Sequence, residues 1–452
     1  MIPRMETQRA SAVQQPQDDS KRGDLLVNNL IYRQPQALSL AKSRTQVKQF
    51  FQRSDYPSAQ GKTAIIDWNT GSSYIDVGNS YLSFKVIAKN TAGNTEFSYG
   101  SGSAMNVINR ITIRSRSGTE LERLEGANLW SKINSDFSLP KNFKETMGSA
   151  MGMDGTLSSP PNRMTYETSA SDGSVEYDIR AVIPLRLLCP FFQPLKGQLL
   201  PPQLASGLHI EIVFENSSSV FLQPTTATDL VTTYDVKDVH FLLDTVDLSD
   251  ETQKTINMES ADNGLEWVTP RIYTAITSLP SGQSRLSVQV RKACSQATMA
   301  YSAIQQTSKF NDVKQDSLET MAMNSLGAAT WQYRIGSLHF PQQPIVEDEQ
   351  SFLTRGTKSY YEALYAFDKP KHPHHEGSVS VRDFLNGKGL FAMSASKNDD
   401  LFLSGLPINN SRVLEFNLEI GGDQLDQDRR LTTFLEYIQV VKCYVDNTAV
   451  AI

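Results

Sequence analysis

The sequence is short of the residues on which small secreted or zinc-bound domains depend. Its 452 residues include only three cysteines, Cys189, Cys294 and Cys443, which are far apart and show no Cys-x-x-Cys spacing. An odd number with this spacing argues against a disulfide framework and against a structural zinc cluster, and it suits a reducing compartment. A chain of this length buries about three quarters of its unfolded surface, so it needs no such staple.

Long apolar runs and an excess of positive charge are also lacking. The formal net charge of -6 and the isoelectric point near 5.6 argue against a globally basic nucleic-acid binder. No stretch approaches the roughly 18 apolar residues of a membrane span, and the polar N-terminus is no signal peptide. We therefore expect a globular protein that is made inside the cell and not secreted, with no sequence-specific nucleic-acid binding.

Catalytic motifs are lacking too, since there is no Gly-x-Ser-x-Gly elbow, no Walker loop and no His-Glu-x-x-His. Three of the six histidines, His372, His374 and His375, form the one dense cluster of possible ligands. A metal site would need their imidazoles to converge, yet Pro373 separates two of them and no cysteine is near. A solvated turn is the favoured interpretation, and ion binding stays open. His209, His240 and His339 lie in strand patterns and are expected to be packed or hydrogen-bonded. We expect no catalytic residue, no cofactor and no enzyme activity.

The first residues differ in composition from the rest. Residues 1–50 hold eight Lys/Arg and four Asp/Glu, a net charge of +4, so the remaining 402 residues carry -10. Tyr32 and Phe50 are the only aromatic residues in this stretch. The composition predicts an N-terminal arm over 1–60. Such an arm either ties subunits together, faces an anionic partner, or is a frayed terminus.

Short strand patterns follow the arm. The clearest is a hairpin with one wet face, Val107–Arg114 and Thr119–Leu124, joined through Gly118, whose positive φ suits a tight connection. Spacing of large apolar residues then predicts a short helix over 127–137. Residues 138–174 read as a long loop of the kind that is functional or interfacial.

A second series of strand patterns begins near residue 234. The Ser/Thr-rich stretch 216–230 is the best candidate for a domain boundary. Asp250 with Gln253 resembles a capping box for a short helix, and 330–340 reads as one strand. We expect an all-β chain with a first unit over 61–230 and a second over 231–452, each a sandwich or barrel.

The order of these elements resembles the double jelly-roll major capsid proteins of polinton-like viruses, virophages and the adenovirus-hexon lineage. Three passages carry the resemblance: Val107–Trp130, similar to the early strand pair and helix of the first roll; Tyr234–Asp244, similar to the strand that opens the second; and Ile335–Phe367, similar to the link into its long connection. The likeness is one of pattern and order over roughly 62–450.

The resemblance implies two consecutive eight-stranded antiparallel jelly rolls with a few short helices in the loops. It implies a homotrimer that forms a pseudo-hexameric tile of an icosahedral virion shell, in contact with neighbouring trimers and with penton or minor capsid proteins. The N-terminal arm would then contact neighbours, the genome or an internal membrane. The family brings no catalytic residues to carry over.

A second hypothesis is a β-sandwich protein that binds or cleaves carbohydrate. It would need aromatic platforms and, for cleavage, two facing carboxylates. The four tryptophans, Trp68, Trp130, Trp267 and Trp331, are spread along the chain in patterns that favour core positions. A cellular β-rich scaffold protein is a third possibility that the sequence leaves open.

Overall fold

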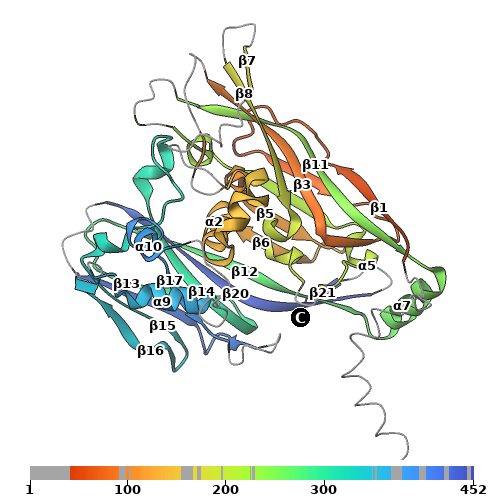
Figure 1. Ribbon diagram of the computed structural model, residues 1–452. Coiled ribbons are helices and arrows are strands. Elements are labelled where there is room, and N and C mark those ends of the chain that lie inside the picture. The colour runs from red at the N-terminus through yellow and green to blue at the C-terminus, as the bar shows by residue number, and fades with distance from the viewer. Residues whose placement is uncertain are drawn as a thin grey trace, which may run out of the picture.

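The computed structural model in Figure 1 consists mainly of long antiparallel strands. It describes residues 41–90, 98–100, 103–153, 166–169, 175–194, 197–223, 225, 230–348, 350–351, 354–367, 379–396, 404–421, 427–444 and 449–451. These strands form two sandwiches that touch each other.

The first sandwich uses strands from the first half of the chain. They are β1 (Ala41–Phe50), β2 (Thr63–Asp67), β3 (Tyr74–Asn90), β5 (Ile108–Arg114), β6 (Glu120–Glu125), β7 (Tyr166–Ser169), β8 (Val175–Pro184), β9 (His209–Phe214) and β11 (Thr233–Leu248). One sheet has the order β1-β11-β3-β8-β7 and the other β2-β9-β5-β6. The ring of Trp68, beside β2, meets that of Phe241 in β11 at 5.3 Å, so the core lies between the two sheets. A short pair, β4 (Ser98–Tyr99) with β10 (Phe221–Leu222), stands apart.

The second sandwich is built in the same way. Its strands are β12 (Leu265–Leu279), β13 (Arg285–Val290), β14 (Cys294–Gln306), β15 (Ala328–Ile335), β16 (Leu338–Glu347), β17 (Phe391–Ser394), β18 (Leu406–Ile408), β19 (Leu414–Gly421), β20 (Arg429–Cys443) and β21 (Ala449–Ala451). One sheet has the order β12-β20-β14-β17, with β18 beside β14 and β21 beside β20, and the other β13-β19-β15-β16. The Tyr333 hydroxyl of β15 donates to Ser302 Oγ of β14 at 2.8 Å, across the interior of the sandwich.

The strand order of the two sandwiches is identical. We number the main strands of each from 1 to 8 in chain order, leaving out the accessory strands β4, β7 and β10 in the first sandwich and β18 and β21 in the second. Both sandwiches then have one sheet ordered 1-8-3-6 and one ordered 2-7-4-5. Eight antiparallel strands in two sheets with these crossovers form a jelly roll. The predicted fold class, two consecutive eight-stranded jelly rolls, is confirmed.

Strand pairing moves the boundaries between the rolls. β1 pairs with β11, and β11 pairs with β3, so both lie in the first roll. The predicted boundaries had placed β1 in the N-terminal arm and β11 at the start of the second roll. Composition alone does not reveal this pairing, because β1 is an exposed polar strand and the stretch before β11 is rich in Ser and Thr. We propose 41–248 and 265–443 as the extents of the two rolls; residues 1–40 lie outside the described part.

Helices occupy the connections between strands. They are α2 (Ala127–Ser138), α3 (Lys141–Glu145), α4 (Leu185–Leu188), α5 (Pro202–Ala205), α6 (Ser217–Val220), α7 (Asp250–Asp262), α9 (Lys358–Ala366), α10 (Val381–Asn386) and the 3-10 turns η1 (Ala104–Val107), η2 (Met147–Met151), η4 (Pro190–Phe192), η5 (Thr307–Asn311) and η6 (Met323–Leu326). None of the described helices is long and apolar enough to cross a membrane.

Three local predictions need correction. The cap of α7 is Ser249, whose side chain accepts from the Thr252 backbone N–H, and not Asp250. The predicted strand 330–340 is a hairpin of β15 and β16, because Gly336 adopts φ +61° and turns the chain. The β5–β6 hairpin forms as predicted, and Arg114 and Arg123 on its outer face are partly exposed, but Thr112 on the same face is buried.

Candidate functional site

The predicted histidine cluster gives no site that can be described. His372, His374 and His375 lie outside the described residues, so the choice between a solvated turn and an ion site stays a prediction. Within the described ranges, no group of three or more His, Cys, Asp or Glu side chains is arranged to hold a metal ion.

Two of the strand histidines are hydrogen-bonded, as predicted. His209 Nδ1 lies 2.7 Å from Asp67 Oδ1, and its Nε2 lies 3.2 Å from Glu211 Oε1. His240 Nδ1 lies 2.8 Å from the backbone oxygen of Asp238. His209 thus lies between two carboxylates of its own sheet. The expectation for His339 of β16 needs correction, because this residue is exposed.

The tryptophans on which a sugar could stack are inside the protein. All four tryptophans expose 3% or less of their surface, which confirms the prediction that they are core residues. Burial removes them as stacking platforms for a sugar. The carbohydrate hypothesis therefore has no exposed tryptophan to rest on.

The cysteines are free thiols, as the predicted absence of a disulfide framework requires. Burial raises the pKa of Cys294 to about 11 and that of Cys443 to about 12. Thiols with raised pKa values hold little thiolate and react slowly. These side chains act as small apolar residues and not as nucleophiles.

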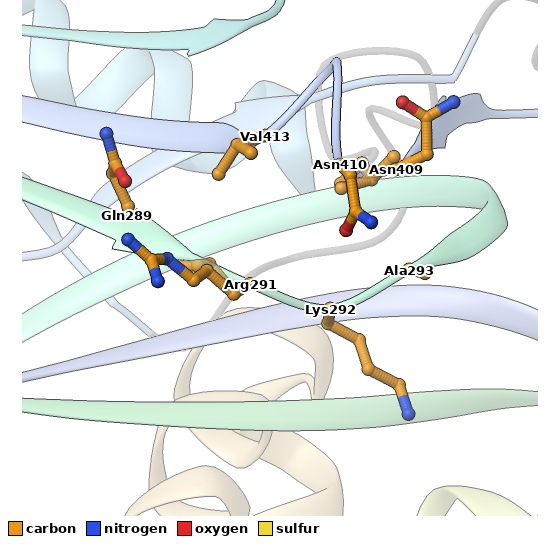
Figure 2. Close-up of a pocket in the computed structure, with 9 residues that line it drawn as sticks. Gln289, Arg291, Lys292, Ala293, Asn409, Asn410 and Val413 are labelled. Atoms are coloured by element: carbon orange, nitrogen blue, oxygen red, sulfur yellow. The ribbon is translucent and has the colours of Figure 1, made fainter.

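A cavity of about 390 Å³ lies where the β13–β14 connection faces the β18–β19 connection. Figure 2 shows Gln289, Arg291 and Lys292 on one side of it and Asn410 and Val413 on the other. Its lining contains no carboxylate, histidine or cysteine. The cavity thus has hydrogen-bonding groups and two cations, Arg291 and Lys292, with no acidic group among its lining residues.

The most elaborate arrangement of buried polar groups lies instead where the two rolls meet. Glu122 of β6 is fully buried, and its Oε1 lies 3.8 Å from Nε of Arg271 on β12. Burial raises the pKa of Glu122 to about 7, although the Arg271 charge opposes the shift. Arg271 also donates to Gln439 Oε1 at 2.6 Å. The Thr274 hydroxyl donates to the Glu125 backbone oxygen at 2.9 Å.

Apolar packing accompanies these polar contacts. The Trp267 indole of β12 packs against the Phe191 ring in the first roll, with ring centroids 6.3 Å apart. Its Nε1–H donates to the Phe191 backbone oxygen at 3.2 Å. We call the contact of β6 and η4 with β12 the intrachain junction.

The predicted helix α2 forms a second link between the rolls and lies between them in Figure 1. Its buried Asp136 accepts from Lys144 Nζ at 2.6 Å and from Lys388 Nζ, which belongs to the second roll, at 2.9 Å. Burial alone would raise the pKa of Asp136, but the charges of Lys388, Lys144 and Lys132 hold it below the usual value. Buried Lys132 donates to the Leu318 backbone oxygen at 2.8 Å.

Local sequence patterns give no sign of these buried charges. Glu122 lies in the alternating run Glu120–Glu125, which reads as a surface strand, and Lys132 and Asp136 read as the polar face of an amphipathic helix. Residues of the second roll, more than a hundred positions further along, lie against them: Arg271 beside Glu122, Leu318 beside Lys132 and Lys388 beside Asp136. Contacts with such distant residues cannot be predicted from the local sequence pattern.

Comparison with known proteins gives a result at the level of structure only. A scan against protein-family models finds no match, and a search of curated proteins finds none. Among solved structures, the PBCV-1 virus capsid superimposes with a TM-score of 0.59 at 10% identity, covering 93% of this chain and 98% of that chain. The Faustovirus major capsid protein gives 0.60 at 8% identity, covering 93% and 94%.

The mavirus major capsid protein gives a TM-score of 0.54 at 10% identity, covering 100% of this chain and 96% of that chain. Identities this low establish the fold and carry no residue-level role. The resemblance noted in the sequence is thereby confirmed as a likeness of fold over almost the whole chain. The chain has the double jelly-roll fold found in these viral major capsid proteins.

Proposed function

We propose that this chain is the major capsid protein of an icosahedral virus and that it assembles as a homotrimer. One observation carries the proposal: a single chain contains two jelly rolls of identical strand order, in the fold of known capsid proteins. A chain that duplicates one sandwich offers two similar building blocks with a fixed spacing.

The two rolls of each chain allow a closed ring to form. Three copies around a threefold axis bring six similar rolls into a ring, so the outline is close to sixfold. Contacts of this kind are heterologous, and a ring closes when the rotation between neighbours returns to its start. Such a tile can be surrounded by six near-equivalent neighbours in the shell. Each stable obligate contact between subunits buries on the order of 2,000 Å² or more.

The role is structural, with no catalytic step. Its main partners are copies of the same chain, first within the trimer and then between trimers. Penton or minor capsid proteins complete the shell, and the N-terminal arm contacts neighbours, the genome or an internal membrane. The protein is made in the host-cell interior and resides in the virion.

Electron microscopy of the purified protein tests this proposal. Negatively stained particles are expected to have a hexagonal outline with six lobes, and concentrated samples are expected to form sheets or shells of these tiles. Small two-lobed particles at every concentration, without ordered arrays, would overturn it.

A further inference from the structure

The two rolls do not use equivalent strands where they meet inside one chain. At the intrachain junction, the first roll contributes β6, its fifth main strand, and the second contributes β12, its first. Because both rolls have the same strand order, each of these two strands has an equivalent in the other roll that takes no part in the intrachain junction. The fifth strand of the second roll is β16, and the first strand of the first roll is β1.

Burial separates the two used strands from the two unused ones. On β12, alternate residues Trp267, Thr269 and Arg271 share one face and are all buried. On β1, every residue except Gln49 is exposed, and on β16 only Ile345 and Glu347 are buried. Strands at equivalent positions in the two rolls therefore differ in burial: β12 contacts the other roll of the same chain, whereas β1 and β16, among the described residues, do not.

The strands β1 and β16 also carry apolar side chains that are partly exposed to solvent. Val47 and Phe50 of β1 are 38% and 61% exposed, and Leu338 and Val346 of β16 are 48% and 58% exposed. Both strands are sheet edges, and within the described residues no strand pairs with their outer side. An exposed edge with apolar side chains is typical of a surface that another chain covers.

We propose that β1 of one copy docks against β16 of the next copy, so that the contact between subunits repeats the intrachain junction. The inference rests on the proposed function and deepens it by naming the two strands that form the trimer contact. Six junctions then run around the ring, alternating between β6–β12 inside a chain and β16–β1 between chains. The contact is head-to-tail, because β1 and β16 are different surfaces.

Cysteine cross-linking tests the pairing directly. Val47→Cys and Val346→Cys are made separately and together in a Cys294→Ser background, which removes the one native thiol that is not buried. With a short bis-maleimide, a mixture of the two single variants is expected to give a covalent dimer on a denaturing gel. The double variant is expected to give covalent dimers and trimers. Each single variant alone is expected to stay monomeric on the gel.

Two results would overturn the docking arrangement. Cross-linking of Val47→Cys with itself would mean a twofold contact through β1. Failure of the mixture to cross-link, while the uncross-linked protein is a trimer in solution, would mean that other surfaces form the trimer.

Charge insertion gives an independent measurement on the same strands. Phe50→Asp and Val346→Asp are each expected to raise the concentration at which the trimer half-dissociates by roughly 30-fold or more. The matched control is Met258→Asp on α7, at a side chain 69% exposed, which is expected to leave that concentration unchanged. All three positions are exposed, so folding of the single chain is not at stake.

The outcomes separate the two proposals. A wild-type protein that is monomeric at all concentrations overturns the capsid trimer and this contact together. A trimeric wild type whose dissociation is unchanged in Phe50→Asp and Val346→Asp overturns the β1–β16 contact alone.

Discussion

The covered edges of the two rolls and the uncovered ones have the same place in the fold and opposite surroundings. β6 and β12 bury a carboxylate and a guanidinium side by side, and β12 buries an indole against Phe191 of η4. β1 and β16 hold exposed valine and aromatic or leucine side chains at the rim of their sheets. The comparison shows that strand order alone does not decide burial, since the neighbouring roll does.

The covered junction depends on polar groups that are costly to bury singly. Breaking a buried ion pair by removing one partner leaves an uncompensated charge, whereas the intact pair contributes little net stability. Glu122 with Arg271, and Asp136 with its lysines, therefore make the fit between the rolls specific more than they make it strong. The four predictions below test this, each on the single chain at a dilution where unfolding no longer depends on concentration.

The largest expected effect comes from Trp267→Ala on the covered strand. The change removes a buried indole and its hydrogen bond to Phe191, and it should cost about 4 kcal/mol of unfolding free energy in urea. Phe50→Ala on the uncovered strand should change the same free energy by about 0.5 kcal/mol or less. Equal costs for the two variants would contradict the distinction between the strands.

Asp136→Asn should follow, with a loss of about 3 kcal/mol, because Lys144 and Lys388 lose the charge that balances them. The pKa of Asp136 is lowered in the folded protein, so its contribution is present above the ordinary carboxyl range and is lost as the pH falls below it. The difference between variant and wild type should thus shrink below about pH 4. The control is Glu145→Gln in the exposed Lys141–Glu145 pair, expected to cost about 0.5 kcal/mol or less. A cost for Asp136→Asn no larger than that of the control would count against the α2 link.

Glu122 should make stability depend on pH in the opposite direction. Its pKa rises from 4.5 to about 7 on folding, so the folded state retains a proton that the unfolded state releases. Stability from this group is complete below pH 4.5 and falls as the pH rises through 7, by about 3 kcal/mol in all. Urea unfolding of wild type and Glu122→Gln between pH 5 and pH 8 should show the decline in the wild type only. Parallel curves would mean that Glu122 is not buried by the second roll.

The smallest effect is expected for Thr274→Val. This isosteric change removes the hydroxyl that donates to the Glu125 backbone oxygen, and it should cost about 1 kcal/mol. Thr277→Val, further along the same strand at a half-buried position, is the matched control and should be neutral within about 0.5 kcal/mol. A neutral Thr274→Val would show that the hydrogen bond does not hold the rolls together.

Much of the fold was predictable because strands carry local signals. The predicted hairpin of 107–114 and 119–124 is β5 with β6, shifted by one residue at its ends, and β9 alternates between buried and half-buried residues. Helix α2 begins at Ala127, where the spacing of large apolar residues begins. These features depend on neighbours within a few residues, which a sequence displays directly.

The pairing of distant segments was not predictable in the same way. β1 reads as part of a polar arm, and only its pairing with β11, some two hundred residues later, makes it a strand of the first roll. β11 looks like the start of a new unit because its apolar run follows a Ser/Thr-rich loop. Thr274 and Glu125 are 149 residues apart, so nothing near either residue announces their contact.

The mass of the purified chain in solution tests the central claim most directly. Light scattering after size exclusion is expected to give a stable particle of three times the 50.3 kDa chain mass, without intermediate species at micromolar concentrations. A mass of one chain at every concentration would contradict the account, because two rolls in one chain would then have no ring to complete.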